Sequence, residues 1–345
     1  MAYFKQFGGK VTAGEREKYS RSPNWDGRRF TNLEETTMDV SLSKIPGLLH
    51  KQMTGASGRM PERPIPVESF DRQAFLEDSP VPKAIWYGHS VLMLRIGGMN
   101  ILIDPMFGPN ASPIAPFPTR RFSEHTLDII GQLPDIDLML LSHDHYDHLD
   151  YESLRRLRPK IREFFTALGA ARHLRAWGIS DTRIREFDWW DQADLGPLRI
   201  TFTPSRHFSG RGISDRARSL WGGWALHVPG HSVYFSGDGG YGNHFREVGN
   251  RLGPFDFAFM ECGQYYHLWH AIHMYPEESI QAALDAGVRT TMPVHWGAFS
   301  LAFHPWDEPV ERFSAAATDH LSFILPRPGD IFTLDENYGN RAWWV

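Results

Sequence analysis

The sequence predicts an α/β protein in which two β-sheets are covered by outer helices. Strand-like runs separated by helical stretches occur in two halves of the chain, as expected for two such layers. The run IDLMLLS (Ile136–Ser142) is continuously apolar, which is typical of a strand buried on both faces. The chain has 345 residues, enough to bury a full core between the layers.

The first half begins with three strand-like runs. AIWY, VLMLRI and MNILIDP follow one another from Ala84, and Gly97-Gly98 predicts a hairpin between the last two. After the buried run, LDYESLRRLRP predicts a helix that begins near Asp150 and ends before Pro159. EFFTAL then predicts a strand and GAARHLRAW a helix, which completes the first group.

The second half repeats this alternation. LRITFTP, GGWALHV, SVYFSGD and FDFAFME predict four strands. PEESIQAALDAG predicts a helix with Pro276 in its first turn and Gly287 after its end. TTMPVHWG and DIFTL predict two further strands, and EPVERFSAAATDH predicts a helix between them.

The chain divides into two parts at about residue 80. Residues 1–80 are rich in charge, Gly and Pro, and we interpret them as an N-terminal extension that packs on the core. Within them MPERPIPVESFD, around Pro61 to Asp71, predicts a connecting arm. We assign residues 81–345 to a single catalytic domain.

Composition narrows the class of partner. The net charge is −5 and no block of like charge stands out, which argues against nucleic-acid binding. Cys262 is the only cysteine, so no intramolecular disulfide can form; we expect a cytoplasmic protein, with a disulfide-free secreted protein as the alternative. The N-terminus has no signal-peptide core, and no window reaches the ~18 apolar residues of a membrane helix. Peripheral membrane contact through Phe4, Phe7 and Trp344 is an open alternative to simple packing, and the sequence sets no oligomeric state.

The segment SHDHYDHLD, directly after the buried run, carries the most chemical information. His143, His145, Asp147 and His148 fall within six positions, and only a loop can turn all four side chains to one place. On a loop they divide naturally between two adjacent cations. Mixed imidazole and carboxylate ligands suit Zn²⁺, and also manganese or iron.

Three further candidate ligands stand where predicted strands end. His207 follows LRITFTP, Asp238 follows SVYFS, and His295 lies in TMPVHWG. Each has an apolar strand before it and a polar or Gly-containing loop after it. Strand ends provide a rigid scaffold for ligands while the loops shape the pocket.

The order HxHxDH, His, Asp, His resembles the metallo-β-lactamase superfamily, whose fold is a four-layer αββα sandwich of two mixed sheets. That resemblance implies that His143, His145 and His207 bind one metal, that Asp147, His148 and His295 bind a second, and that Asp238 bridges both. The stretches WYGHS, LWGGWAL, GDGGY, RLGPFD, HMYPEE and VHWGAF are similar, in the same order, to the N-acylphosphatidylethanolamine-hydrolysing phospholipase D family, as is the N-terminal GRRFTN (Gly27–Asn32).

The closer resemblance implies a role for His273, which lies in HMYPEE just before a predicted helix. The matching histidine of that family contacts the substrate phosphate, and a helix N-terminus would favour the same anion. We therefore take Asp147, Asp238 and His273 as the catalytic residues. A buried structural histidine is the alternative for His273.

Several other residues allow two interpretations. His89 and Asp104 either orient a metal ligand by hydrogen bonding or only form turns. His267 and His270, in QYYHLWH, line the substrate pocket or belong to a packed aromatic wall, and here the sequence departs from the resembled family.

The remaining candidates are interpreted as structural. We assign Tyr146 to packing. The tryptophans expected in the core and pocket wall are Trp221, Trp224, Trp296 and Trp306, and the histidines expected at the surface or in loops are His227, His231, His244 and His304. The run Gly237–Gly240 lacks the Lys and Ser/Thr of a P-loop, so we expect its glycines to let the backbone pass close to the metals.

These residues together predict a binuclear metal-dependent hydrolase. Two divalent ions would bind a bridging water, lower its pKa towards ~7, and so provide a hydroxide nucleophile. The resemblance favours a phosphodiester, carried by a small molecule or by a phospholipid such as an N-acylphosphatidylethanolamine. A lactonase or carboxylic-ester hydrolase is the first alternative, and a non-catalytic metal-binding protein is the second.

Overall fold

Among the residues that the computed structural model describes (5–38, 44–54, 57–112, 118–212, 214–335 and 338–345), two seven-stranded sheets form the centre. In spatial order the first sheet is β14 (Ile331–Thr333), β1 (Lys83–Trp86), β2 (Leu92–Ile96), β3 (Met99–Ile103), β4 (Ile136–Leu141), β5 (Ile161–Ala167) and β6 (Ile184–Phe187). The second is β13 (Ser322–Phe323), β12 (Val288–Val294), β11 (Phe255–Glu261), β10 (His231–Phe235), β9 (Gly223–Val228), β8 (Leu198–Thr203) and β7 (Gln192–Leu195).

Both sheets are mixed, and each has one parallel half and one antiparallel half. The strands from β3 to β6 pair in parallel, whereas β14, β1, β2 and β3 pair antiparallel. In the second sheet the strands from β10 to β13 are parallel, and those from β7 to β10 are antiparallel. The predicted hairpin at Gly97-Gly98 joins β2 to β3, with Ile96 opposite Met99.

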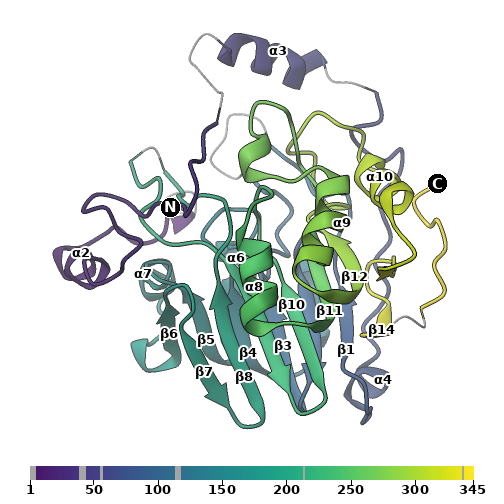
Figure 1. Ribbon diagram of the computed structural model, residues 1–345, viewed down its shortest axis with the longest axis horizontal. Helices are drawn as coiled ribbons and strands as arrows, with labels where there is room; N and C mark the ends of the chain where they lie inside the picture. The colour runs from purple at the N-terminus through teal and green to yellow at the C-terminus, as the bar shows by residue number, and fades with distance from the viewer. Residues whose placement is uncertain (1–4, 39–43, 55–56, 113–117, 213, 336–337) are drawn as a thin grey trace.

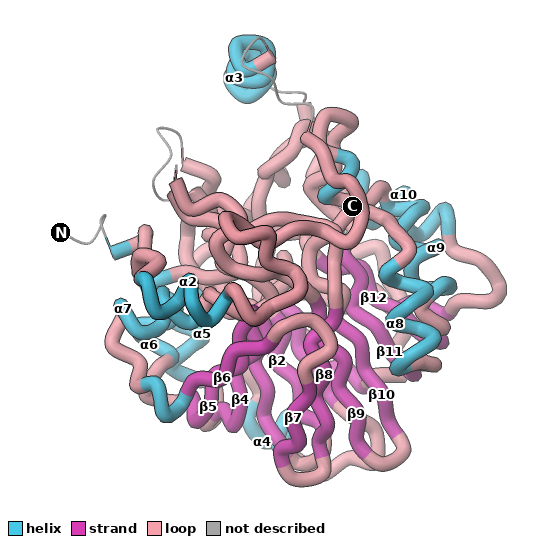
Figure 2. The backbone as a smooth tube through the Cα atoms, turned by 60° about the vertical axis from the view of Figure 1, so that its left-hand side comes forward, coloured by secondary structure: helices cyan, strands magenta, loops and turns pink. Residues whose placement is uncertain are grey.

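Helices cover the outer face of each sheet. The helices on the first sheet are α5 (Thr126–Gln132), α6 (Tyr151–Leu157) and α7 (Ala171–Ala176), and those on the second are α8 (His244–Leu252), α9 (Pro276–Asp285) and α10 (Glu308–Ala316). Figure 2 shows the strands in the middle, with α5, α6 and α7 on one side and α8, α9 and α10 on the other. The predicted αββα sandwich is confirmed.

Three apolar clusters fill the three spaces between these four layers. Along β4, Leu138 and Leu140 belong to the cluster between the sheets, whereas Met139 and Leu141 face the helices of the first sheet. The third cluster lies between the second sheet and its helices. Side chains that alternate in this way bury both faces of β4, as its continuous apolar sequence predicted.

The N-terminal segment contributes to the inter-sheet cluster. It contains α2 (Ala13–Tyr19), α3 (Ile45–Thr54) and α4 (Arg72–Leu76), and α2 begins with a capping box formed by Thr12 and Glu15. Tyr19 and Phe30 are buried in the same cluster as the strands. The predicted connecting arm between α3 and α4 forms neither helix nor strand over residues 61–70. Helix α3 lies at the top of the view in Figure 1, and its Lys51 Nζ donates to the Tyr266 hydroxyl at 2.8 Å.

Two further expectations concern membranes. Within the described ranges, each helix is too short or too polar to cross a bilayer. The aromatic residues at the chain ends differ in position: Phe7 is half-buried, Trp344 packs edge-on against Trp296 at 6.1 Å, and Phe4 lies outside the described residues.

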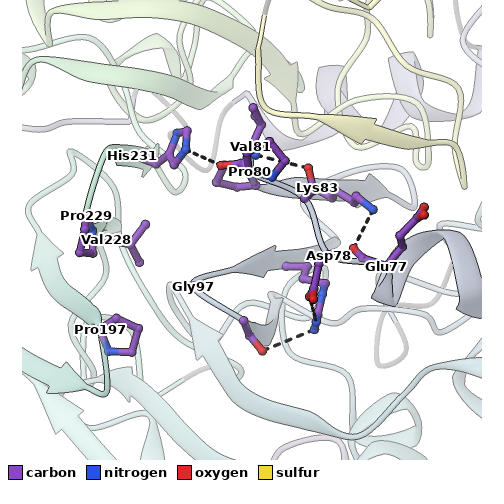
Figure 3. Close-up of a pocket in the computed structure, with 14 residues that line it drawn as sticks. Glu77, Asp78, Pro80, Val81, Lys83, Gly97, Pro197, Val228, Pro229 and His231 are labelled. Atoms are coloured by element: carbon purple, nitrogen blue, oxygen red, sulfur yellow. Dashed lines mark hydrogen bonds and ion pairs between the residues drawn. The ribbon is translucent and has the colours of Figure 1, made fainter.

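A small cavity of about 200 Å³ lies at the hairpin end of the sheets (Figure 3). Gly97, Pro197 and Pro229 come from the turns between β2 and β3, β7 and β8, and β9 and β10. The polar groups around it bond to the chain itself, since Lys83 Nζ donates to Glu77 O and His231 Nε2 bonds to Pro80 O. This end is opposite to the strand ends that carry the candidate ligands.

Candidate metal centre

The candidate ligands meet at one edge of the sandwich. The loop with HDHYDH follows β4, and loops after β8, β10 and β12 carry His207, Asp238 and His295. β4 runs through the first sheet, and the other three strands belong to the second. All seven predicted ligands are therefore brought together from four strand ends, and no predicted ligand lies elsewhere.

One group consists of three histidines. His143 Nε2 lies 2.9 Å from His145 Nδ1, which lies 3.2 Å from His207 Nε2. These nitrogens all fall within 4.8 Å of one another, a spacing that allows one ion to contact all three. His143 and His207 are 1% exposed, so the group is shielded from bulk water.

A second group combines a carboxylate with histidines. Asp147 Oδ2 lies 3.3 Å from His295 Nε2 and 3.5 Å from His148 Nε2. His89 also reaches this carboxylate, with its Nε2 at 2.8 Å. The four ligand atoms fall within 4.8 Å of one another.

The carboxyl group of Asp238 lies between the two groups. Its Oδ2 is 3.0 Å from the Nε2 atoms of both His148 and His295, and 3.8 Å from the Nε2 atoms of both His143 and His207. One oxygen is therefore close to nitrogens of both groups. This is the geometry expected of a ligand shared by two ions.

Burial sets the protonation of the first group. It lowers the pKa of His143 and His207 well below the usual value and lowers that of His145 to about 4, so these imidazoles are neutral at pH 7. Neutral imidazole is the form that binds metals. Burial alone would lower the pKa of His148, but the neighbouring carboxylates of Asp238, Asp147 and Asp104 raise it to about 10. This part of the site therefore favours a positive charge.

The donor set fits divalent ions. Asp238 Oδ1 is buried, and no hydrogen-bond partner for it lies among the described residues, which is costly unless another group satisfies it. Imidazole nitrogens and carboxylate oxygens are ligands for zinc, manganese and iron.

Comparisons with known proteins agree with this geometry. The family described as beta-lactamase superfamily domain matches residues 99–296, more than half of the chain. An uncharacterized protein of Mycobacterium tuberculosis is 36% identical over 342 residues, covering 97% of this chain and 91% of its own length. This chain belongs to the metallo-β-lactamase superfamily.

Relatives whose names state an activity are less similar to this chain. N-acyl-phosphatidylethanolamine-hydrolyzing phospholipase D 1 of Caenorhabditis elegans is 28% identical, covering 90% of this chain and 89% of its own. Among solved structures, Igni18, a metallo hydrolase from Ignicoccus hospitalis, has a TM-score of 0.57 at 22% identity and covers 74% of this chain and 99% of its own. The latter likeness supports the fold alone.

Two residues outside the predicted set form hydrogen bonds with candidate ligands. Asp104 Oδ2 lies 2.8 Å from His148 Nδ1, so the hydrogen bond considered from the sequence is present. His89 contacts Asp147 in the same way and is completely buried, with φ of 55°. For both residues the structure favours an orienting role over turn formation alone.

His273 lies beside the cluster with its side chain 13% exposed. Its ring is parallel to that of His295, with centroids 5.1 Å apart, and edge-on to that of His207 at 5.0 Å. The N-terminus of α9 follows at Pro276, and Glu277 and Glu278 lie in its first turn. Both carboxylates are paired, Glu277 with Arg312 and Glu278 with His270, each at 2.7 Å.

Other aromatic residues keep structural positions. Tyr146 donates from its hydroxyl to Arg211 O, as expected of a packing residue. His270 pairs with Glu278 at 2.7 Å, and His267 is exposed beside Tyr266. The expected core tryptophans Trp221, Trp224, Trp296 and Trp306 all pack in or against the inter-sheet cluster.

The structure agrees only in part with the surface or loop positions expected for four histidines. His244 is 4% exposed and begins α8, which corrects that prediction. His227 and His231 lie within β9 and β10, and His304 packs on Tyr265 at 4.4 Å. Periodicity did not reveal these positions because polar residues occur freely in half-buried strands.

The glycines around Asp238 serve a purpose different from the one expected. A Cβ on Gly237, where φ is 63°, would lie 2.2 Å from Gly222 O, and one on Gly240 would lie 2.2 Å from Ala271 O. The close approach that requires glycine is thus between two backbone segments. It keeps the loop after β10 tightly packed beside the site.

The sequence analysis missed a buried ionic network within the motif itself. Asp144 contacts Arg172 and His173 at 3.0 Å and accepts hydrogen bonds from Ser219 Oγ and Gly210 N. Burial would raise its pKa, but these partners hold it well below the usual range. The network ties the ligand loop to α7 and to the loop after β8.

Proposed function

We propose that this protein is a binuclear metal-dependent phosphodiesterase. The metal would be Zn²⁺, with manganese or iron as alternatives. One ion would be held by His143, His145 and His207, and the other by Asp147, His148 and His295. Asp238 would be shared between the two ions. The observation that carries this proposal is the position of Asp238 Oδ2, within 3.8 Å of imidazole nitrogens of both groups. A single-ion site would not require one carboxylate to reach both groups.

The chemistry that such ions supply when bound is a lowered pKa of coordinated water and polarisation of a phosphoryl oxygen. The protein's own contribution is to place these ligands rigidly and to exclude bulk water around them. His273, which lies beside His207 and His295, would contact an oxygen of the substrate. A cavity of about 460 Å³ borders His207, Phe208 and Ile272, and we place the substrate's entrance there.

A phosphodiester substrate is favoured over a lactone or ester by the relatives. Proteins of Caenorhabditis elegans and of Saccharomyces cerevisiae named for hydrolysis of N-acyl-phosphatidylethanolamine are 28% and 31% identical to this chain. The first covers 90% of the chain, including the N-terminal segment beside the site. We therefore propose a phospholipid or a related small phosphodiester as substrate, with peripheral contact to a membrane when the substrate is a lipid.

The test is a substrate panel with defined metals. The purified protein is stripped with a chelator, reloaded with zinc, manganese or iron, and assayed with bis(p-nitrophenyl) phosphate, N-acylphosphatidylethanolamine vesicles, a lactone and p-nitrophenyl acetate. We expect metal-dependent turnover of the phosphodiesters and about two ions per chain. Turnover of the lactone or ester alone would replace the proposal with the first alternative, and a chain that binds metal but turns over none of them would be a binding protein.

A further inference from the structure

A buried glutamate, Glu261, contacts His273. Glu261 is the last residue of β11, and its side chain is completely buried. Its Oε1 lies 3.0 Å from His273 Nδ1, and its Oε2 accepts a hydrogen bond from Met274 N at 3.1 Å. We propose that Glu261 is a positioning residue, which keeps a proton on Nδ1 of His273 and turns Nε2 of that ring to the substrate.

The hydrogen-bond pattern determines which nitrogen carries the proton. An ionised carboxyl group has acceptors only, and Met274 N–H already occupies one of its oxygens. His273 Nδ1 must therefore be the donor to the other oxygen. Nε2 is then the nitrogen that can meet a substrate, whether it presents a lone pair or, in the protonated ring, an N–H.

The ring orientation is determined by the neighbouring ligands. His273 lies parallel to His295, with an interplanar angle of 13°, and edge-on to His207. One of its nitrogens falls within 4.8 Å of ligand atoms of both His207 and Asp238. Contact with Glu261 at Nδ1, with the parallel ring of His295 and with the edge-on ring of His207 restricts the orientation of the His273 ring.

Backbone hydrogen bonds link Glu261 to the segments that carry two candidate ligands, His295 and Asp238. Glu261 is opposite Val294 in the pairing of β11 and β12, directly before His295. Its N–H donates to Ser236 Oγ, two residues before Asp238. Strand pairing that sets the positions of these two ligands therefore also sets the position of Glu261.

A glutamine at this position separates the positioning role from a structural one. The Met274 N–H cannot change from donor to acceptor, so the amide oxygen of Glu261→Gln must face it. The amide NH₂ then faces His273 Nδ1 and requires that nitrogen to be bare. The variant keeps both contacts and the fold, but it moves the proton of a neutral His273 from Nδ1 to Nε2.

The first measurement is ¹⁵N NMR of the histidine rings in the full-length protein, with the His273 signals assigned by their loss in His273→Gln. We expect a protonated Nδ1 in the wild type and a bare Nδ1 in Glu261→Gln. The inference is overturned if wild-type Nδ1 is bare, a result that needs no Glu261 variant, or if Nδ1 keeps its proton in Glu261→Gln. This measurement does not depend on the proposed function.

The second measurement uses rate and rests on the proposed phosphodiesterase activity. With bis(p-nitrophenyl) phosphate we expect Glu261→Gln to lower kcat about 10- to 100-fold, as loss of an orienting partner commonly does. In a His273→Gln background the same change should cause no further loss, because its effect passes through His273. An equal loss in that background would assign the effect to His295, whose Nδ1 is 3.5 Å from Glu261, and would overturn the inference.

The chain offers a matched control in Glu278. Its carboxyl group contacts His270 Nε2 at 2.7 Å and accepts a hydrogen bond from Tyr275 N, which repeats the arrangement of Glu261 near the surface. Glu278→Gln should leave both the His273 signals and kcat unchanged. Absence of any phosphodiester turnover in the wild type would reject the proposed function, while the NMR result would still decide the role of Glu261.

Discussion

His148 Nδ1 lies 2.8 Å from Asp104 Oδ2, and both side chains are completely buried. Asp104 also accepts hydrogen bonds from the backbone N–H and the hydroxyl of Ser142, directly before the ligand loop. This arrangement leaves His148 Nε2 directed towards Asp238, 3.0 Å away. A residue at the end of β3, 44 positions before His148 in the sequence, thus orients a candidate ligand at the end of the neighbouring strand β4.

We expect Asp104→Asn to weaken zinc binding about 10- to 100-fold. Both carboxyl oxygens of Asp104 accept hydrogen bonds from His148 or Ser142, whereas the amide nitrogen of asparagine cannot accept one. Competition with a chromophoric chelator measures the affinity directly. Asp128→Asn is the control, since that exposed carboxyl lies 3.8 Å from the exposed His125. Unchanged affinity in Asp104→Asn would show that the hydrogen bond does not orient His148.

Asp238→Asn should affect both ions together. The substitution removes the charge of the one carboxylate that is close to both histidine groups, so we expect a metal content clearly below two ions per chain and a larger loss of rate than in Asp104→Asn. Elemental analysis after gel filtration gives the metal content. Asp194→Asn, which removes an exposed ion pair with Arg199, is the matched control. An Asp238→Asn protein with full metal and full rate would contradict the shared ligand.

Much of the site could be predicted because its ligands follow strongly apolar strands. The apolar runs of β4 and β12 predict buried strands, and a buried polar residue at the end of such a strand is more often functional than structural. Glu261 follows the same pattern at the end of FDFAFM, so the same signal could have found it. The sequence does not indicate its contact with His273, because the two residues are 12 positions apart and no local pattern pairs them.

Other parts could not be predicted, for physical reasons. β6 and β7 are edge strands with exposed polar residues, so IREF and QADL lack the apolar run that identifies a strand. Helix α8 contains Gly249, which lowers helix propensity, although its buried face packs well. The partners of Asp144 lie 28 and 29 residues away in α7, and no local pattern indicates a contact of that range.

The buried network around Asp144 predicts a large effect on stability. Asp144→Ala removes the nearer of the two carboxylates that pair with the buried guanidinium of Arg172 and leaves Asp215 Oδ2 at 3.6 Å, so we expect a loss of about 3 kcal/mol in the free energy of unfolding. Adding Arg172→Met should recover part of that loss, because the incompletely paired buried charge is then absent. Urea unfolding of the metal-loaded proteins measures both. A double variant less stable than Asp144→Ala would show that Arg172 stabilises the fold by contacts other than this ion pair.

His244 predicts a pH dependence that is independent of the metal site. Burial, with a smaller effect of Arg206, lowers its pKa in the folded protein to about 3, and its Nε2 has no hydrogen-bond partner in the structure. Below about pH 6.5 the unfolded chain takes up a proton at this residue and the folded chain does not, so its contribution to stability falls as the pH falls, by roughly 1 kcal/mol per pH unit. His244→Phe keeps a ring beside Phe245 and removes this loss. The difference in unfolding free energy between variant and wild type should therefore be constant from pH 7 to 8 and should shift in favour of the variant from pH 6 to 4.5; a constant difference throughout would mean that His244 is protonated in the folded protein.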